Sequence, residues 1–99
     1  MEITKTTENN AAELRLSGRL DTVTAPQLQT ALEEAFRDSS DIMLDFSGIA
    51  YVSSAGLRVL LLGEKAAKAN GKSMKLRNVM PEVMEVFEMT GFSDILTID

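Results

Sequence analysis

The sequence of 99 residues contains no cysteine and no histidine. Without cysteine the chain can form neither a disulfide framework nor a thiolate metal site. Without histidine it lacks the commonest general base and metal ligand. These two absences disfavour catalysis, and we therefore expect a protein that is not an enzyme and that uses no cofactor or metal.

Positive charge and long apolar runs are also scarce. Ten Lys and Arg residues stand against fifteen Asp and Glu residues, which leaves a formal net charge of −5. Nucleic acid is then not an expected partner, because phosphate binding depends on basic side chains that displace counterions. The longest apolar run, Val59 to Leu62, is far shorter than the roughly 20 residues of a membrane-spanning helix. Residues 1–5 do not resemble a signal peptide, so we expect a cytoplasmic protein without direct membrane insertion.

The composition that remains is typical of one compact domain. Hydrophobic residues make up 44% of the chain, which is enough for one core and too little for two. No internal repeat, linker or low-complexity segment interrupts the sequence. Residues 1–99 are therefore expected to fold as a single domain.

The first half of the chain carries strand signals. Ile3–Thr7 and Glu13–Ser17 alternate in polarity on either side of the turn signal Glu8–Asn10, which predicts a hairpin. Ile42–Phe46 is a short and almost continuous apolar run, as expected for a central strand covered on both faces. Ser47–Gly48 is a turn signal that would end this strand.

Three segments carry helix signals. Thr24–Gln27 matches a capping box with an early proline, which predicts a helix start at Thr24. A second helix is expected from about Ser54 to Asn70, with Glu64 on its outward face and Gly71 as its C-cap. A third helix is expected to begin at Met80–Pro81 and to end at Gly91.

The order of these elements predicts the fold class. Ser73–Arg77 adds a strand, and Phe92–Ile98 adds a terminal strand or a docked tail. A hairpin followed by helix, strand, helix, strand and helix gives an α/β sandwich with a mixed sheet and helices packed mainly on one side. Right-handed crossovers would place the loops that carry Asp21 and Ser54 on one edge.

The segment Tyr51–Arg58 is the most informative for function. It sets two adjacent hydroxyls, Ser53 and Ser54, at a predicted helix start, where free amides and the positive end of the helix dipole favour an anion. Phosphorylation there would add roughly −1.5 to −2 charges and would repel a docked partner. The alternative is that one serine only caps the helix while Gly56 permits close packing. Both interpretations fit the local sequence.

Asp21 and Arg58 are further candidates. On the neighbouring loop, the Asp21 carboxylate would orient an acceptor hydroxyl or bind a partner. Its alternative is an Asx turn that holds the loop before Thr24. Arg58 would project near Ser54 and pair with a phosphate or with a partner's carboxylate, unless it is only a surface arginine. Asp45 lacks the second acidic residue and the lysine that a receiver-domain site requires.

Several segments, in their order along the chain, resemble the STAS domain, the fold of bacterial anti-sigma factor antagonists. Together these segments span nearly the whole sequence. They are Gly18–Asp21 with Thr24–Ala25, Ile42–Ser47, Tyr51–Arg58, Asn78–Val83 and Thr90–Phe92.

The resemblance implies a regulatory protein rather than an enzyme. Such proteins bind an anti-sigma factor, itself a Ser/Thr kinase with a GHKL-type ATPase fold, and thereby free a sigma factor. In the family the kinase phosphorylates a serine, and a PP2C-type phosphatase reverses the modification. Alignment on Gly56 places that serine at Ser54. The partner-binding residues implied in this way are Asp21, Thr22, Ser53, Ser54, Ala55, Gly56 and Arg58.

The chain departs from the family pattern at two positions of this segment. Ala55 replaces the family's usual second hydroxyl residue, which leaves Ser54 as the better-aligned acceptor. Ser53 stands where the family usually has Asp, which makes Ser53 a competing phosphate acceptor. The resemblance therefore leaves a second function open, that of a constitutive STAS subunit of an ABC-type lipid transporter or another regulatory complex. Ser53 in place of Asp fits this second function better.

Overall fold

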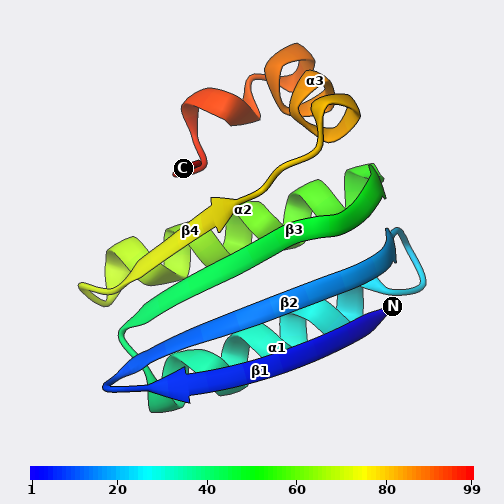
Figure 1. Ribbon diagram of the computed structural model, residues 1–99. Helices are drawn as coiled ribbons and strands as arrows, with labels where there is room; N and C mark the ends of the chain where they lie inside the picture. Colours follow the sequence, from blue (N-terminus) through cyan, green and yellow to red (C-terminus); the bar gives the residue numbers. More distant parts are fainter.

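A four-stranded sheet in the order β1-β2-β3-β4 forms the base of the computed structural model, which describes residues 1–99 (Figure 1). Strands β1 and β2 are antiparallel, whereas β2–β3 and β3–β4 are parallel pairs. The predicted mixed sheet with an N-terminal hairpin is therefore confirmed. In chain order the elements are β1 (Glu2–Glu8), β2 (Ala11–Leu20), α1 (Ala25–Asp38), β3 (Asp41–Val52), α2 (Ser54–Ala69), β4 (Ser73–Arg77), α3 (Pro81–Thr90) and a 3-10 turn (Phe92–Asp94).

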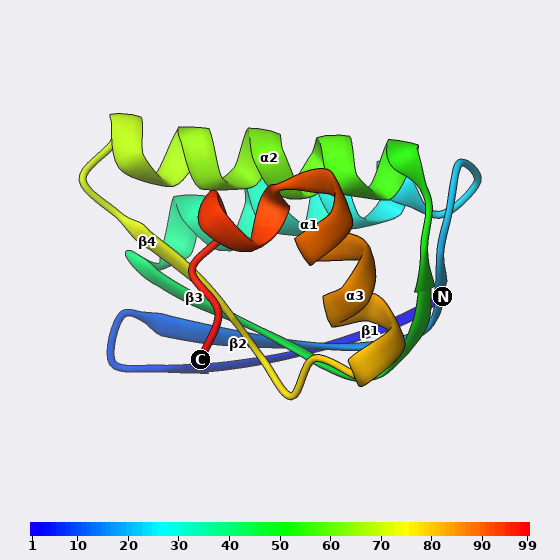
Figure 2. The ribbon, with the colours of Figure 1, turned by 90° about the horizontal axis from the view of Figure 1, so that it is seen from above.

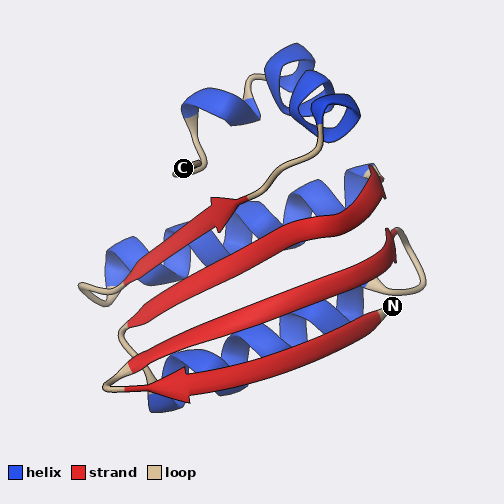
Figure 3. Cartoon of the chain, viewed as in Figure 1, coloured by secondary structure: helices blue, strands red, loops and turns tan.

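The helices cover a single face of this sheet. Helices α1 and α2 run side by side over it, and the strands lie below them as one layer (Figures 2 and 3). Helix α3 lies beside the C-terminal half of β3, beyond the end of the short strand β4 (Figure 1). There the ring of Phe87 packs 6.2 Å from that of Phe46 between ring centroids.

The expectation that β3 is covered on both faces is wrong. Ile42, Leu44 and Phe46 are buried under the helices. The residues between them, Met43 and Asp45, face the other side of the sheet, since successive side chains of a strand point to opposite faces. Met43 is only partly buried. The apolar run hides this alternation because Met43 is apolar although it lies on the face away from the helices.

The predicted turn at Ser47–Gly48 is also wrong, because β3 continues to Val52. The pairing of β2 with β3 shifts register in this stretch, between Arg15 and Ser17 and again between Gly18 and Arg19. A β-carbon at Gly48 would lie 2.7 Å from the carbonyl oxygen of Leu16. Glycine here permits a close approach of two strands instead of ending one.

The remaining boundaries follow the local signals. Asn9 and Asn10 both have positive φ, 48° and 67°, as the tight turn of a two-residue hairpin requires. Gly71 follows α2 with φ 64°, and the amide of Lys72 returns to the carbonyl of Ala67 at 2.8 Å. This Schellman-type ending needs a left-handed residue, which glycine adopts without strain. Gly91 ends α3 in the same conformation.

Glu64 is buried, with 4% of its surface exposed, although helical periodicity placed it outward. Its Oε1 accepts hydrogen bonds from the backbone amide and the hydroxyl of Thr97, at 3.2 and 3.3 Å. The C-terminal residues return along the edge of β4, where Ile98 pairs with Leu76. The C-terminal tail is therefore docked on β4 through one isolated β-bridge and does not form a strand. It covers Glu64, a position of α2 that the sequence assigned to solvent.

Candidate functional site

The ends of β2 and β3 bring the two predicted loops together. Leu20 and Val52 are partners in the parallel pairing, and the amide of Ser53 donates to the carbonyl of Leu20 at 2.8 Å. The loop that follows β2 and the first turn of α2 therefore lie at the same end of the molecule (Figure 2). This confirms that Asp21 and Ser54 share one edge.

Gly56 allows the first turn of α2 to rest on the end of β2. A β-carbon at Gly56 would lie 2.6 Å from Cγ of Leu20 and 3.0 Å from its carbonyl oxygen. Real β-carbons do not approach other atoms this closely without displacing them. Gly56 is buried, so its contribution to the site is to set the position of the helix rather than to contact a partner.

The two serines occupy different positions. Ser53 is the N-cap of α2, with extended backbone, and its hydroxyl oxygen accepts from the amide of Gly56 at 3.3 Å. Ser54 is the first residue of the helix, is exposed, and has no part in the cap. The capping interpretation therefore applies to Ser53, and it leaves the hydroxyl of Ser54 free at the surface.

The carboxylate of Asp21 holds its own loop. Oδ1 accepts from the backbone amides of Val23 and Thr24, both at 3.0 Å, which is the Asx turn considered above. The pKa of Asp21 is lowered, chiefly by the amide of Thr24, with the Thr24 hydroxyl, the amide of Val23 and the charge of Arg19 outweighing an opposing effect of burial. Asp21 forms no hydrogen bond with either serine, so it does not orient the hydroxyl of Ser54 here.

The predicted capping box at the start of α1 is wrong. The hydroxyl of Thr24 donates to the carbonyl of Arg19 at 2.7 Å and makes no cap bond to the helix. Gln27 reaches the carbonyl of Met1 at 3.0 Å instead of the cap position. The helix begins where it was predicted to begin, but its cap threonine serves the Asx turn.

Three residues at this edge were not identified from the sequence. The guanidinium carbon of Arg19 lies 4.1 Å from the ring centroid of Tyr51, and Nε of Arg19 lies 3.7 Å from Oδ2 of Asp21. Val23 is 85% exposed at the tip of the loop. The Arg19–Tyr51 contact depends on the register of two strands, which no local pattern reveals. Arg58 is exposed as expected, Thr22 is exposed as well, and Ala55 is half-buried.

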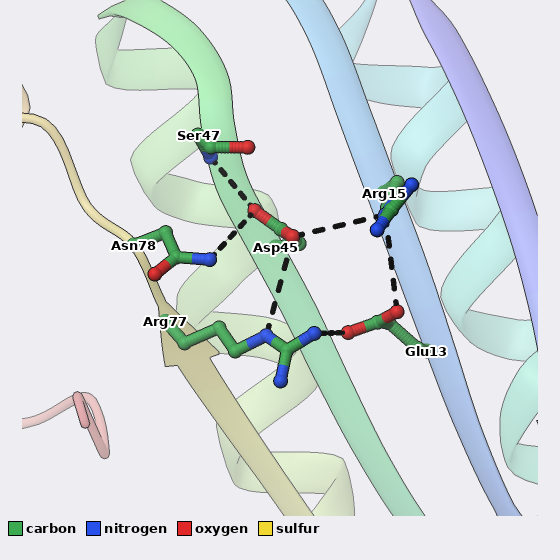
Figure 4. A network of polar contacts seen from close by, with 6 residues as sticks. All are labelled: Glu13, Arg15, Asp45, Ser47, Arg77 and Asn78. Atoms are coloured by element: carbon green, nitrogen blue, oxygen red, sulfur yellow. Dashed lines mark hydrogen bonds and ion pairs between the residues drawn. The ribbon is translucent and has the colours of Figure 1, made fainter.

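Asp45 lies on the face of the sheet that the helices leave open (Figure 4). Its Oδ1 accepts from the amide of Ser47 at 2.9 Å and from the side chain of Asn78 at 3.4 Å. Burial raises the pKa of Asp45, but the hydrogen bonds from Ser47 and Asn78 and the charge of Arg77 outweigh it, and the pKa falls below its usual value. Asp45 is thus held as a carboxylate.

The second oxygen of Asp45 joins an ion-pair network across the sheet (Figure 4). Oδ2 lies 3.9 Å from Nε of Arg15 and 4.0 Å from Nε of Arg77. Both arginines also pair with Glu13. The network links β2, β3 and β4 and has no lysine, so Asp45 has a structural environment rather than that of a phosphate acceptor.

No group of three or more acidic, histidine or cysteine side chains is placed to hold a metal ion. No helix combines the length and the apolar character needed to cross a bilayer.

Comparison with known proteins agrees with this architecture. The family described as "Mlab, STAS domain" matches residues 3–97. The anti-sigma-B factor antagonist of Bacillus subtilis (strain 168) is 30% identical over 89 residues, which are 90% of this chain and 82% of that protein. The anti-sigma-B factor antagonist of Staphylococcus aureus (strain NCTC 8325 / PS 47) is 28% identical over 100 residues, which cover 100% of this chain and 93% of that protein.

Solved structures share the fold over almost the whole chain. The anti-sigma factor antagonist SpoIIAA in its unphosphorylated form superposes with a TM-score of 0.82 at 21% identity, covering 99% of this chain and 88% of SpoIIAA. The phosphorylated form of SpoIIAA from Bacillus superposes with a TM-score of 0.76 at 20% identity, covering 99% and 91% of the two chains. Because the family match extends over residues 3–97 and the sheet and helices agree with these neighbours, the chain belongs to the STAS domain family.

Proposed function

We propose that this protein is an anti-sigma factor antagonist whose binding is switched off by phosphorylation of Ser54. It binds an anti-sigma kinase of the GHKL ATPase type through the edge formed by the Asp21 loop and the start of α2, and so frees a sigma factor. In this role it is the substrate of the kinase and not an enzyme itself. The single observation that carries the proposal is the different placement of Ser53 and Ser54.

The cap supports Ser54 as the phosphate acceptor over Ser53. The hydroxyl oxygen of Ser53 already accepts from the amide of Gly56, and phosphorylation there would disturb the bond that begins α2. A helix cap of this kind contributes about 1 kcal/mol to stability. Ser54 is exposed and carries no such bond, so it is accessible to a kinase at no cost to the fold.

The charges at this end of α2 also suit a phosphate at Ser54. The amides of the first helical turn and the positive end of the dipole of a 16-residue helix lie beside it. Arg58 is exposed four residues later, a spacing at which helix side chains are neighbours. Ser53 keeps the cap without adding the negative charge of the family's usual Asp. The modification is therefore tolerated within the domain itself.

The same modification would oppose docking. A phosphate adds roughly −1.5 to −2 charges and three hydrogen-bond acceptors to the surface. Docking would then cost the desolvation of the phosphate, and the phosphate would repel acidic groups of the partner. The names of the relatives support this assignment, since two are anti-sigma-B factor antagonists and SpoIIAA has been solved in both phosphorylation states. A PP2C-type phosphatase would reverse the step, and we place the protein in the cytoplasm with the kinase and the sigma factor.

The test uses the purified protein and the GHKL-type anti-sigma kinases of the same organism, with labelled ATP and mapping of the labelled residue. We expect label on Ser54 in the wild type and in Ser53→Ala, and none in Ser54→Ala. We also expect Ser54→Asp to bind the kinase more weakly than the wild type. Transfer to Ser53, or no transfer together with unchanged binding of Ser54→Asp, would reject the switch.

Ser53 itself favours one second candidate, a constitutive STAS subunit of an ABC-type lipid transporter. A neutral residue stands where the family's switch segment has Asp, and the cap is retained without it. Such a subunit would need the docking edge but not the modification. Purification of the tagged protein from its own cells separates the two functions, because recovery of a transporter ATPase in place of a kinase would favour the subunit.

A further inference from the structure

Val23 is the most exposed of the large apolar side chains, at 85%. Single exposed apolar residues are common on protein surfaces and need no explanation by themselves. Val23 differs because of how its loop is held. It stands between β2 and α1, at the edge that also carries Ser54.

The loop that carries Val23 is fixed by hydrogen bonds at both sides of the residue. The carboxylate of Asp21 accepts from the amides of Val23 and Thr24, both at 3.0 Å. The hydroxyl of Thr24 donates to the carbonyl of Arg19 at 2.7 Å and accepts from the amide of Asp21 at 2.9 Å. The backbone that carries Val23 is therefore ordered before any partner arrives, which reduces the entropy lost on binding.

Asp21 links the Val23 loop to two residues of the types that dominate protein interfaces, since Nε of Arg19 lies 3.7 Å from its Oδ2. Arg19 stacks on Tyr51 at 4.1 Å, with the Arg19 side chain 66% exposed and Tyr51 42% exposed. Arginine and tyrosine are enriched among the residues that carry most binding energy. The loop adjoins the start of α2, because the carbonyl of Leu20, which lies between Arg19 and Asp21, accepts a hydrogen bond from the amide of Ser53.

We propose that Val23 is the apolar anchor of the docking surface and inserts into an apolar pocket of the anti-sigma kinase, while the Arg19–Tyr51 pair, joined to the same loop through Asp21, contributes to the same surface. The inference rests on the proposed function, because the kinase is the occupant. Asp21 then acts as a positioning residue: its carboxylate presents Val23 to the partner instead of contacting the partner or Ser54.

The test compares kinase binding by variants that differ in polarity at position 23. Val23→Thr keeps the branched side chain and replaces one methyl group with a hydroxyl, and Val23→Ile keeps the apolar character. We expect Val23→Thr to raise the Kd for the kinase roughly tenfold, as for a central interface anchor. Val23→Ile should bind like the wild type. Met89→Thr is the matched control, since Met89 is 78% exposed on α3, and its Kd should not change.

The role of Asp21 is tested by a double-mutant cycle. Asp21→Ala by itself should weaken kinase binding. The double variant Asp21→Ala/Val23→Thr should raise the Kd by clearly less than the product of the two single effects, because both changes act through the side chain of Val23. Thermal unfolding of Val23→Thr should match that of the wild type, which excludes misfolding as the cause.

The outcomes separate this inference from the proposed function. If the wild type binds the kinase and Val23→Thr binds equally well, the anchor is rejected and the Ser54 switch stands. If the effects of Asp21→Ala and Val23→Thr multiply independently, the positioning role of Asp21 is rejected. If the wild type binds no GHKL-type kinase at all, the proposed function is rejected, and the anchor with it.

Discussion

Replacing Gly56 with alanine tests the packing that positions the candidate site. The new β-carbon would lie 2.6 Å from Cγ of Leu20 and 3.0 Å from its carbonyl oxygen. Neither atom is the free end of a flexible side chain, so the first turn of α2 or the end of β2 has to move. Overpacking of this kind costs typically about 1–3 kcal/mol. Alanine also favours the helix over glycine by up to about 1 kcal/mol, which offsets part of that cost.

Gly63→Ala is the matched control because it lies in the same helix and gains the same helix propensity. Its β-carbon would lie 2.8 Å from Sδ of Met74 and 3.1 Å from Cδ1 of Leu32. Both atoms are near the free ends of flexible side chains, which can rotate away. The propensity gain cancels in the comparison, so Gly56→Ala should be less stable than Gly63→Ala by about 1–3 kcal/mol.

Urea unfolding followed by circular dichroism measures this difference as a shift of the midpoint at constant slope. In thermal unfolding it corresponds to at least about 4 °C for a domain of this size. Gly56→Ala should also weaken kinase binding, because displacement of α2 separates Ser54 from the Val23 loop. Equal stability of the two variants would show that Leu20 does not confine the start of α2, and the reasoning would fail.

Two further predictions concern the cap and the open face of the sheet. Ser53→Ala removes the acceptor for the amide of Gly56 and should lower the free energy of unfolding by about 1 kcal/mol, measured in urea; an unchanged value would contradict the cap. The pKa of Asp45 in the folded protein lies below the ordinary value of an aspartate, so its carboxylate stabilises the fold above about pH 4, and this contribution is lost as pH falls through the folded pKa. Asp45→Asn should therefore have a lower free energy of unfolding at pH 7, and that free energy should fall less steeply below pH 4 than in the wild type. Urea titrations from pH 7 to pH 2.5 measure both; a decline as steep as that of the wild type would assign the acid sensitivity to other carboxylates.

Much of the fold and part of the site were predictable because their signals are local. The turn at Asn9–Asn10, the helix start at Ser53–Ser54 and the end at Gly91 each depend on backbone conformations that a few adjacent residues impose. The shared edge of Asp21 and Ser54 followed from the order of strands and helices and from the handedness of crossovers. The STAS resemblance lay in several such segments in the right order, and the family match over residues 3–97 agrees with it.

The chain by itself thus determined the elements, their order and the edge at which Ser53 and Ser54 lie, because these depend on neighbours in sequence. Only the tertiary structure decided what the polar side chains do there. Thr24 had a helix cap and an Asx turn within reach and took the turn, and Glu64 is buried by Thr97, 33 residues away. Such choices depend on groups that meet only after folding, and for that reason the exposed Val23, held by Asp21, was visible only in the folded protein.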